Sequence, residues 1–292
     1  MTQFQPFSIN IRGKLLMIDS PQIMGIVNIT PDSFYEGSRT MQTDDIKRRV
    51  EQLMHEGADM LDIGAYSSRP GADDVSEDEE CSRLETGLAA LREVAGDEIP
   101  VSVDTFRSRV AHLAVSEMGA DIINDISGGL LDCRMMATVA QLHCPYILMH
   151  LRGNPATMQS LCDYSEFNND VTAAVISELS ARVAELRQMG VSDLIVDPGF
   201  GFSKTMEQNY ELMRNLGVIG EAFNAPLLVG VSRKSMVCRA LGVLPDKALN
   251  GTTSLHTIAL LEGASILRVH DVGAAVEART IVQHTFPNHT HH

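Results

Sequence analysis

The sequence lacks the features that mark membrane and secreted proteins. No apolar run approaches the ~18 residues that a membrane-spanning helix needs, and residues 1–10 contain no basic stretch followed by an apolar core, as a secretory signal would. The five cysteines are odd in number and no two have CxxC spacing, which indicates free thiols in a reducing cytosol. We therefore expect a cytoplasmic protein that does not cross a membrane.

Positive charge is also scarce. The chain has 23 Lys and Arg against 38 Asp and Glu, a formal net charge of −15 and an isoelectric point near 5.0. A chain this acidic repels nucleic acid and anionic membrane surfaces. We expect small-molecule partners, with neither nucleic acid nor a membrane among them.

Several well-known catalytic motifs are absent as well. There is no GxGxxG after the first apolar run, no HExxH and no GxSxG, which argues against a Rossmann oxidoreductase, a zincin protease and an α/β-hydrolase. Residues 197–205 (DPGFGFSKT) superficially resemble a phosphate-binding loop. They lack the GxxxxGK[ST] spacing, so we reject a nucleotide-binding P-loop.

What the sequence does contain is a repeated pattern in which a short apolar run stops at a polar residue. The runs cover residues 23–27, 60–63, 101–103, 121–123, 146–149, 194–196, 227–231 and 266–269. Helical patterns lie between them, over residues 44–56, 107–118, 135–142, 171–189, 210–216, 255–261 and 272–284. Alternating strands and helices indicate a parallel sheet, and about eight strands suit a (β/α)₈ barrel. An open doubly wound sheet is the alternative, but the strand count and the polar strand ends favour closure.

The chain is expected to form one domain, because no linker or low-complexity stretch divides its 292 residues. Two short strands within residues 7–18 are predicted to form a β-hairpin that closes the barrel floor. We expect an α/β fold with a TIM barrel over residues 22–284 and a disordered tail over residues 285–292, all within a single domain of residues 1–292.

In a closed barrel the carboxyl ends of the strands meet on one face, so residues far apart in the chain share one site. Asp104, Asn124 and Asp197 follow three different runs. A buried carboxylate needs strong hydrogen bonds, and an amide offers both donors and an acceptor. The three residues therefore suit a flat heterocycle with amino, N–H and carbonyl edges. For any single one of them, capping of the following helix is an equal alternative.

Cationic residue types gather at the same predicted face of an otherwise acidic chain. They are Arg69, Arg233, Lys234, Arg268 and His270. Such a cluster indicates a site for an anion such as phosphate or carboxylate. A surface ion pair is the alternative for each arginine, and Arg268 fits that alternative badly because it lies inside an apolar run.

A polar loop, residues 28–34, follows the first apolar run. Asn28 and Asp32 supply oxygen ligands of the kind that suit Mg²⁺ when a substrate phosphate holds part of the ion's shell. A plain connecting loop is equally compatible with these residues, so the sequence leaves this choice open.

The motifs taken together resemble those of the dihydropteroate synthases, a family of pterin-binding barrels. Residues 24–34 (MGIVNITPDSF) resemble the family's first signature, and residues 57–72 resemble its second. Further motifs follow in the family's order at residues 103–105, 123–129, 149–150, 197–202, 232–235 and 268–271. The resemblance covers nearly the whole stretch from residue 24 to residue 271.

This resemblance implies a transferase of folate synthesis. The enzyme would join 4-aminobenzoate to 6-hydroxymethyl-7,8-dihydropterin pyrophosphate and release 7,8-dihydropteroate and pyrophosphate. The resemblance also implies Mg²⁺ as cofactor, a homodimer formed through outer helices, and competition by sulfonamides at the aminobenzoate site. Pyrophosphate leaves readily once it is neutralised, so no nucleophilic residue is required and an SN1-like route is expected.

Matching positions imply which residues carry these roles. The pterin site would comprise Asp104, Asn124, Asp197, Lys234, Arg268, Met149 and Ile126. The pyrophosphate site would comprise Asn28, Ser68, Arg69, Arg268 and His270, with Asn28 and Asp32 holding Mg²⁺. The aminobenzoate site would comprise Phe34, Pro70, Phe202, Ser232 and Lys234. The expected catalytic residues are Asp104, Lys234, Asp32 and Arg69, and the loops of the last two would close over the site.

The second signature departs from the family pattern Gly-Gly-Glu-Ser-Thr-Arg-Pro-Gly. Tyr66 stands in place of the Glu, and Ser68 stands in place of the Thr but keeps a hydroxyl. In the first loop, Ser38 replaces a common glycine. None of these changes removes a group that is expected to contact the pterin.

Two other hypotheses about the function compete with a synthase. A pterin-dependent methyltransferase domain binds no pyrophosphate, so it would lack the full set of cations. A non-catalytic pterin-binding homologue would most simply lack Lys234 or Asn28. All of these residues are present, which favours the synthase.

Overall fold

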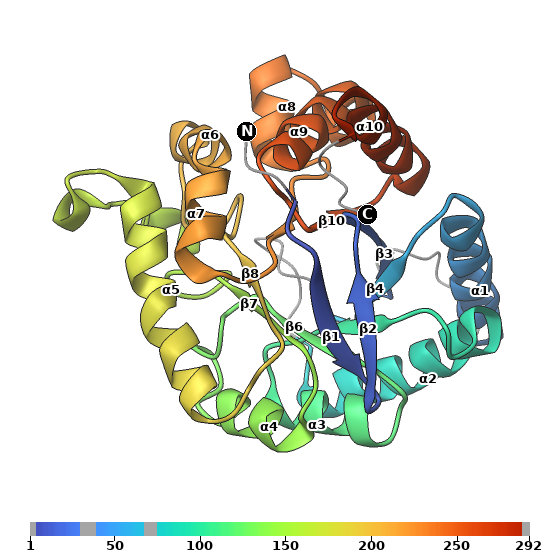
Figure 1. The fold of residues 1–292 in the computed structure, drawn as a ribbon. Helices are drawn as coiled ribbons and strands as arrows, with labels where there is room; N and C mark the ends of the chain where they lie inside the picture. The colour runs from blue at the N-terminus through green and yellow to red at the C-terminus, as the bar shows by residue number, and fades with distance from the viewer. Residues whose placement is uncertain (1–3, 30–38, 67–74, 288–292) are drawn as a thin grey trace.

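The protein is built around a barrel of parallel strands (Figure 1). The computed structural model describes residues 4–29, 39–66 and 75–287, and among these the barrel strands are β3 (Gln22–Asn28), β4 (Met60–Gly64), β5 (Val101–Asp104), β6 (Ile122–Asp125), β7 (Tyr146–Met149), β8 (Leu194–Asp197), β9 (Leu228–Val229) and β10 (Ile266–Val269). They pair in parallel in the order β8-β7-β6-β5-β4-β3-β10-β9. A parallel bridge between Val196 and Leu227 joins the two ends of this order. The structure confirms the (β/α)₈ barrel and excludes the open sheet.

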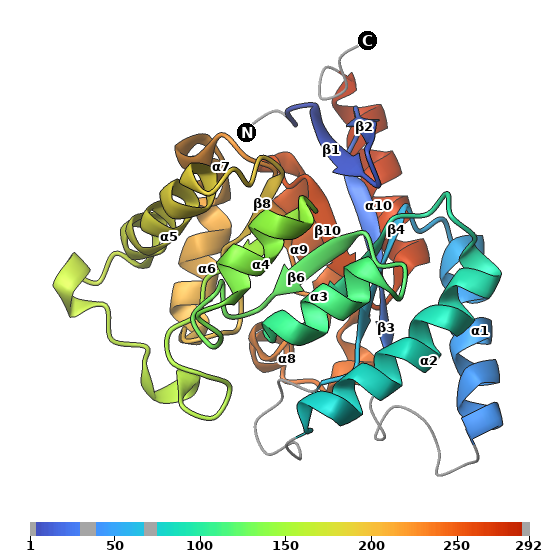
Figure 2. The same cartoon turned by 90° about the horizontal axis from the view of Figure 1, so that it is seen from below.

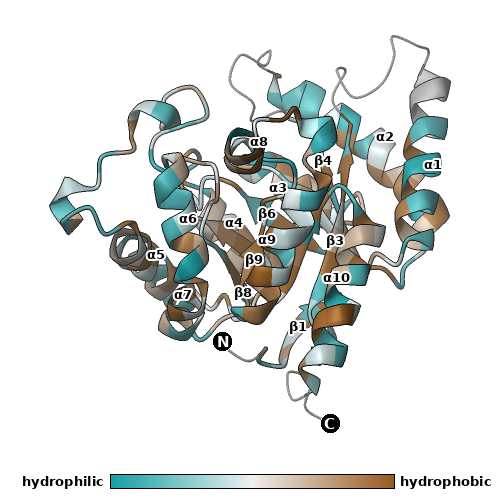
Figure 3. Cartoon of the chain, turned by 90° about the horizontal axis from the view of Figure 1, so that it is seen from above, coloured by the Kyte–Doolittle hydropathy of each residue, from teal (hydrophilic) through white to brown (hydrophobic). Residues whose placement is uncertain are grey.

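Helices surround the barrel. They are α1 (Arg39–His55), α2 (Glu77–Ala95), α3 (Ser108–Ser116), α4 (Met135–Leu142), α5 (Val171–Gln188), α6 (Met206–Arg214), α7 (Leu216–Phe223), α8 (Ser235–Leu241), α9 (Leu249–Leu261) and α10 (Val272–Thr285). Short 3-10 turns occur at Met158–Ser160, Ser165–Phe167 and Pro245–Lys247. Figure 3 shows hydrophobic residues along the central strands and hydrophilic residues on much of the helical layer, as expected when strands are buried on both faces.

The structure corrects three of the predicted boundaries. The helix expected over residues 210–216 is two helices, α6 and α7, because the chain turns at Asn215. The sequence patterns did not indicate α8, and β9 is shorter than the apolar run 227–231 because the chain leaves the sheet after Val229. Helix α10 continues into the first residue of the predicted tail, and residues 288–292 lie outside the described residues.

The two-residue period of a strand decides which side chains enter the barrel. Near the floor the inward side chains are apolar and share one core cluster: Met24, Met60, Ile122, Ile147, Ile195, Leu228 and Ile266. Two residues further along their strands, several inward positions are polar. We call the inward residues Asp62, Asp104, Asn124, Asp197 and Arg268 the polar layer. Outward residues such as Leu61 and Val103 pack in the larger core under the helices.

The predicted floor hairpin is present. Strands β1 (Phe7–Ile11) and β2 (Lys14–Ile18) pair antiparallel across a turn in which Arg12 and Gly13 both have positive φ, of 51° and 78°. Two such residues are what a tight two-residue hairpin turn requires. Ile9 and Ile18 pack against the apolar cluster inside the barrel, which confirms that the hairpin closes the floor. In Figure 2 the hairpin lies at one end of the barrel and α8 at the other.

The described chain agrees with two further expectations. None of its helices is long and apolar enough to cross a membrane. All five cysteines lie within the described ranges, and each is a free thiol. Cys81 and Cys144 are buried, so they contribute to packing as small apolar side chains.

A buried aspartate fastens the hairpin to the barrel. One carboxylate oxygen of Asp121 accepts from Arg12 Nε at 2.6 Å. The other accepts from Arg92 Nη2 at 2.5 Å and from the backbone N–H of Val101 at 2.8 Å. The side chain of Asp121 is fully buried, so the two arginines compensate a charge that water does not reach.

Replacing this aspartate tests how the floor is held. Asp121→Ala should lower the free energy of unfolding by about 3–5 kcal/mol, because it leaves a partly buried arginine and a backbone N–H without their acceptor. Asp97→Ala, which removes the other partner of Arg12, should cost much less because that carboxylate is exposed. Urea unfolding measures both, and equal losses would contradict this account.

Candidate active site

The polar layer is held together by one arginine. A guanidinium nitrogen of Arg268 on β10 lies 2.6 Å from the Asp62 carboxylate on β4, and another lies 2.8 Å from Asp104 at the end of β5. The amide nitrogen of Asn124 lies 3.3 and 3.4 Å from the two Asp62 oxygens. Four strands therefore bring an arginine, two carboxylates and an amide into mutual contact at the carboxyl end of the barrel.

Asp62 is the member of this group that the sequence interpretation missed. It lies inside an apolar run rather than at its end, so it does not show the pattern of a polar residue that follows a strand. A signal was present nevertheless, because a carboxylate within a run that reads as a buried strand requires a cationic partner. Arg268 is that partner, and it carries the same signal in its own strand.

Burial strongly perturbs the charges of the site. Burial raises the pKa of Asp104 to about 7. The positive charge of Arg268 lowers this pKa, and the negative charge of Asp62 raises it further. Burial also raises the pKa of Asp197, although Lys234 acts in the opposite direction. Burial also disfavours the charged form of Arg268, but the negative charges of Asp62 and Asp104 have the larger effect and raise the pKa of the guanidinium. Carboxylates shifted in this way are typical of functional sites.

Lys234 reaches the site from the N-terminus of α8. Its ammonium donates to the carbonyl of Phe200 at 2.6 Å and lies 4.8 Å from the centre of the Phe202 ring, within cation–π range. Burial lowers its pKa to about 8, partly offset by Asp197. Lys234 is therefore still protonated at neutral pH and is tied to the loop that follows β8.

Apolar residues of the predicted site also come together. Ile126 follows β6, Met149 ends β7 and Phe202 lies in the loop after β8. The three lie in one cluster with Leu151 and Met158. This cluster adjoins the polar layer through Met149, which pairs in register with Asp197. A flat ligand that hydrogen-bonds to the polar layer would have an apolar surface beside it.

The structure corrects the interpretation of two predicted cations. Arg233 makes a two-pronged ion pair with Asp271, at 2.7 and 2.8 Å, so its charge is already compensated. Burial, and then Arg268, lower the pKa of His270 to about 4, so this imidazole is neutral at pH 7. Among the cations predicted within the described ranges, Arg268 and Lys234 keep their charge beside the carboxylates of the polar layer.

The structure describes only some of the other residues that were predicted for the site. Asn28 ends β3 and pairs in register with Gly64 at the end of β4. Ser232 is buried, and its hydroxyl lies against His270. The predicted residues Asp32, Phe34, Ser68, Arg69 and Pro70 lie outside the described residues.

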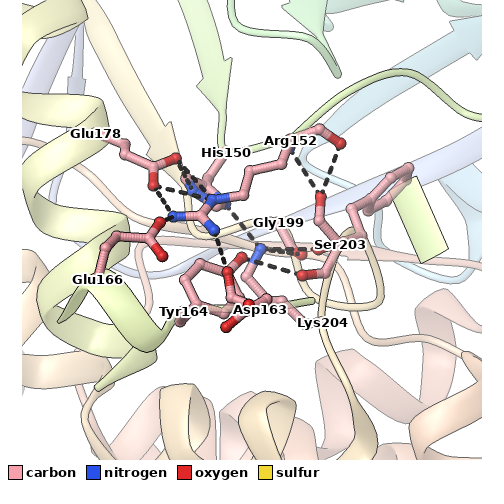
Figure 4. A network of polar contacts seen from close by, with 10 residues as sticks. His150, Arg152, Asp163, Tyr164, Glu166, Glu178, Gly199, Ser203 and Lys204 are labelled. Atoms are coloured by element: carbon pink, nitrogen blue, oxygen red, sulfur yellow. Dashed lines mark hydrogen bonds and ion pairs between the residues drawn. The ribbon is translucent and has the colours of Figure 1, made fainter. Parts of the chain in front are cut away.

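A network of polar contacts holds the loop after β8 (Figure 4). The ammonium of Lys204 donates to the carbonyls of Gly199 and Phe202, at 3.0 and 2.9 Å, and lies 2.9 Å from His150 Nδ1. Burial and Lys204 lower the pKa of His150 to about 3. The ring is therefore neutral, accepts from Lys204, and donates through Nε2 to Glu178 at 3.0 Å.

The network extends to the loop after β7. Arg152 pairs with Glu178, and its backbone N–H donates to the Ser203 hydroxyl at 2.8 Å. Gly199 has a φ of +73°, and a Cβ there would lie 2.0 Å from the carbonyl oxygen of His150, so only glycine fits. The loops after β7 and β8 are thus locked together, which sets the positions of Phe202 and of the carbonyl that holds Lys234.

Comparison with known proteins agrees with this site. Residues 24–270 match a family described as "Pterin binding enzyme". The chain is similar to the dihydropteroate synthase of Escherichia coli (strain K12), with 38% identity over 276 residues that cover 94% of this chain and 95% of the relative. It is similar to the solved dihydropteroate synthase of Xanthomonas albilineans with 4-aminobenzoic acid, at 37% identity and a TM-score of 0.86, covering 96% of this chain and 98% of that one. The same enzyme in complex with 7,8-dihydropteroate gives 35% identity and a TM-score of 0.83, with the same coverage.

Fold and polar layer define a pterin-binding enzyme built on a TIM barrel. Within that class, the chain belongs to the dihydropteroate synthase family, whose members are transferases of folate synthesis. The methyltransferase alternative is not favoured, because these similar proteins are synthases.

Lys204 offers a test of how the loop after β8 is held. Lys204→Met should lower the free energy of unfolding by at least about 3 kcal/mol, because a buried carbonyl, a partly buried carbonyl and His150 Nδ1 lose their donor, and each unsatisfied group costs about 1–3 kcal/mol. Lys247→Met removes an exposed lysine and should change stability by less than about 0.5 kcal/mol. Denaturant titration compares the two variants, and a loss no larger at Lys204 than at Lys247 would refute the role assigned to the network.

Proposed function

We propose that this protein joins 4-aminobenzoate to 6-hydroxymethyl-7,8-dihydropterin pyrophosphate, forming 7,8-dihydropteroate and pyrophosphate. The observation that carries the proposal is the polar layer, in which Asp104, Asn124 and Asp197 stand near Arg268 at the carboxyl end of one barrel. The solved structures of similar synthases with 4-aminobenzoic acid and with 7,8-dihydropteroate support the same pair of substrates.

The pterin is proposed to bind edge-on to the polar layer. Asp104 and Asp197 accept from its amino and ring N–H groups, and Asn124 can both donate and accept. Lys234 has donors only, so it suits the pterin carbonyl and a ring nitrogen. Arg268 packs along the ring face, with the side chains of Ile126 and Met149 adding apolar contact.

The reaction is proposed to follow an SN1-like route. The bond between the pterin methylene carbon and the pyrophosphate oxygen breaks first, and the electron pair leaves with the pyrophosphate. The aminobenzoate nitrogen then attacks the cation and loses a proton. Asp104 and Asp197 stabilise the positive charge that develops on the pterin, while Phe202 and Lys234 hold the aminobenzoate next to it. Phe34, Pro70 and Ser232 are proposed to complete that subsite.

Mg²⁺ is proposed to be shared between the protein and the pyrophosphate. Within the described residues, no group of three or more His, Cys, Asp or Glu side chains could hold a metal, and Asn28 offers one amide oxygen at the end of β3. This sparse donor set fits an ion that keeps waters and takes other oxygens from phosphates. Asn28 and Asp32 would hold the ion, which would help to neutralise the leaving group. Ser68, Arg69, Arg268 and His270 would contact the phosphates.

A direct assay tests this function. The protein, mixed with the pterin pyrophosphate, 4-aminobenzoate and Mg²⁺, should release pyrophosphate and form 7,8-dihydropteroate in equal amounts. Both products should depend on 4-aminobenzoate and fall when a sulfonamide competes with it. Pyrophosphate release that ignores 4-aminobenzoate, or no product at all, would overturn the proposal.

Asp104 should make pterin binding depend on pH. Its pKa of about 7 lies above the usual value of 3.8, so below pH 7 the free protein holds a proton that binding must displace. Pterin affinity should therefore rise up to about tenfold per pH unit between pH 5.5 and 7 and then level off. Asp104→Asn should abolish this dependence and slow turnover by about 10²-fold. Calorimetry and the product assay measure both effects, and unchanged turnover in a natively folded variant would rule out the role.

The protein is further proposed to act in the cytoplasm as a homodimer formed through outer helices. Support comes from large apolar side chains that are exposed near α8 and α9: Leu241, Leu244, Leu249 and Ile258, with Leu244 73% exposed. Exposed apolar side chains on neighbouring elements are what an interaction surface would bury. Leu244→Asp should reduce the mass measured by light scattering from dimer to monomer, whereas Leu15→Asp on the floor hairpin should not. A monomeric wild-type protein would contradict the proposal.

A further inference from the structure

Ser232 and His270 meet where two neighbouring strands end. Ser232 follows β9, His270 follows β10, and these strands pair in parallel. The hydroxyl oxygen of Ser232 lies 3.2 Å from the backbone nitrogen of His270 and 3.1 Å from its ring nitrogen Nδ1. Ser232 is only 5% exposed, so water has little access to this hydroxyl.

The donors and acceptors around this hydroxyl limit where its hydrogen lies. The backbone N–H of His270 can only donate, so the Ser232 oxygen accepts from it. If Nδ1 also carried a hydrogen and donated, the hydroxyl hydrogen of buried Ser232 would have no acceptor among the residues that the structure describes, at a cost of about 1–3 kcal/mol. If the hydroxyl donates to Nδ1 instead, the hydroxyl hydrogen and the backbone N–H both have acceptors. This arrangement leaves the ring hydrogen on Nε2.

The rest of the surroundings agree with a neutral, fixed ring. Burial and the nearby charge of Arg268 disfavour a second ring proton. Arg49 on α1 donates to the His270 carbonyl at 2.6 Å, so the main chain is held on that side as well. Nε2 makes no hydrogen bond within the described ranges, and it is the atom with a hydrogen to offer.

We propose that Ser232 is a positioning residue that holds neutral His270 in the Nε2–H tautomer, so that Nε2–H donates to the pyrophosphate of the substrate. Only the identity of the anion rests on the proposed function, because the tautomer follows from the contacts of Ser232 alone. A neutral donor binds a phosphate oxygen without adding another buried charge beside Arg268.

Nitrogen NMR of the imidazole rings reads the tautomer directly. The full chain has 10 histidines, so the His270 signals are assigned by their loss in His270→Gln. The wild-type protein should show His270 as the Nε2–H tautomer. Ser232→Ala should give a mixture of the two tautomers, whereas Ser232→Thr keeps the hydroxyl and should keep the wild-type signal.

A matched control separates this effect from loss of stability. Ser265 is also 5% exposed, and its hydroxyl accepts from the backbone N–H of Leu227 at 3.1 Å, at the opposite end of the same strand pair. Ser265→Ala should therefore weaken the fold about as much as Ser232→Ala. It should leave the His270 tautomer unchanged.

Binding of inorganic pyrophosphate with Mg²⁺ provides the functional readout. Ser232→Ala should weaken it by the factor by which the Nε2–H population falls, about twofold for an equal mixture of tautomers, and Ser232→Thr and Ser265→Ala should not. An Nδ1–H tautomer in the wild-type protein, or an unchanged tautomer in Ser232→Ala, would overturn the inference. Should Ser232→Ala not fold, the wild-type and Ser232→Thr spectra still decide it. A protein that shows the expected tautomer but forms no dihydropteroate would contradict the proposed function and leave the tautomer inference intact.

Discussion

The contact of Arg268 with Asp62 and Asp104 is the interaction on which the rest of the site depends. A barrel interior without water cannot hold several isolated carboxylates, because each buried charge without a partner costs several kcal/mol. One guanidinium offers donors to two carboxylates at once, so both can remain inside. The three residues come from β10, β4 and β5, and closure of the barrel is what makes the contact possible. A ligand that binds here meets groups that are already oriented.

A second principle of the structure is that buried residues on the side away from the ligand site hold the loops around the polar layer in place. Lys204, His150 and Glu178 tie the loop after β8 to the loop after β7 and to α5, and this loop carries Phe202 and the carbonyl that holds Lys234. Ser232 and Arg49 hold His270 in a comparable way. The residues that face the ligand are thus set by buried neighbours that do not face it, as preorganised sites require.

Much of the fold followed from periodicity and much of the site from chemistry at strand ends. The apolar runs predicted the barrel, and their polar ends correctly singled out Asp104, Asn124 and Asp197 as members of one layer. Asp62 was missed because it lies one step inside its run. Asn124 and Asp125 are neighbours in sequence, yet the first points into the barrel and the second bonds outward to Tyr146. A position at a strand end therefore makes a residue a candidate for the site. The alternation of side chains along the strand decides whether that residue points into the barrel.

The sequence by itself determined the alternation of buried strands and helices, the family motifs and the set of groups available for chemistry, because these depend on residue type and spacing along the chain. Only the tertiary structure decided which charges survive in the site. Arg233 is compensated by Asp271, His270 has lost its charge to burial, and Asp104 titrates near neutrality. The physical reason is that a charge depends on distance to partners and on exclusion of water, and both arise when segments remote in sequence pack together.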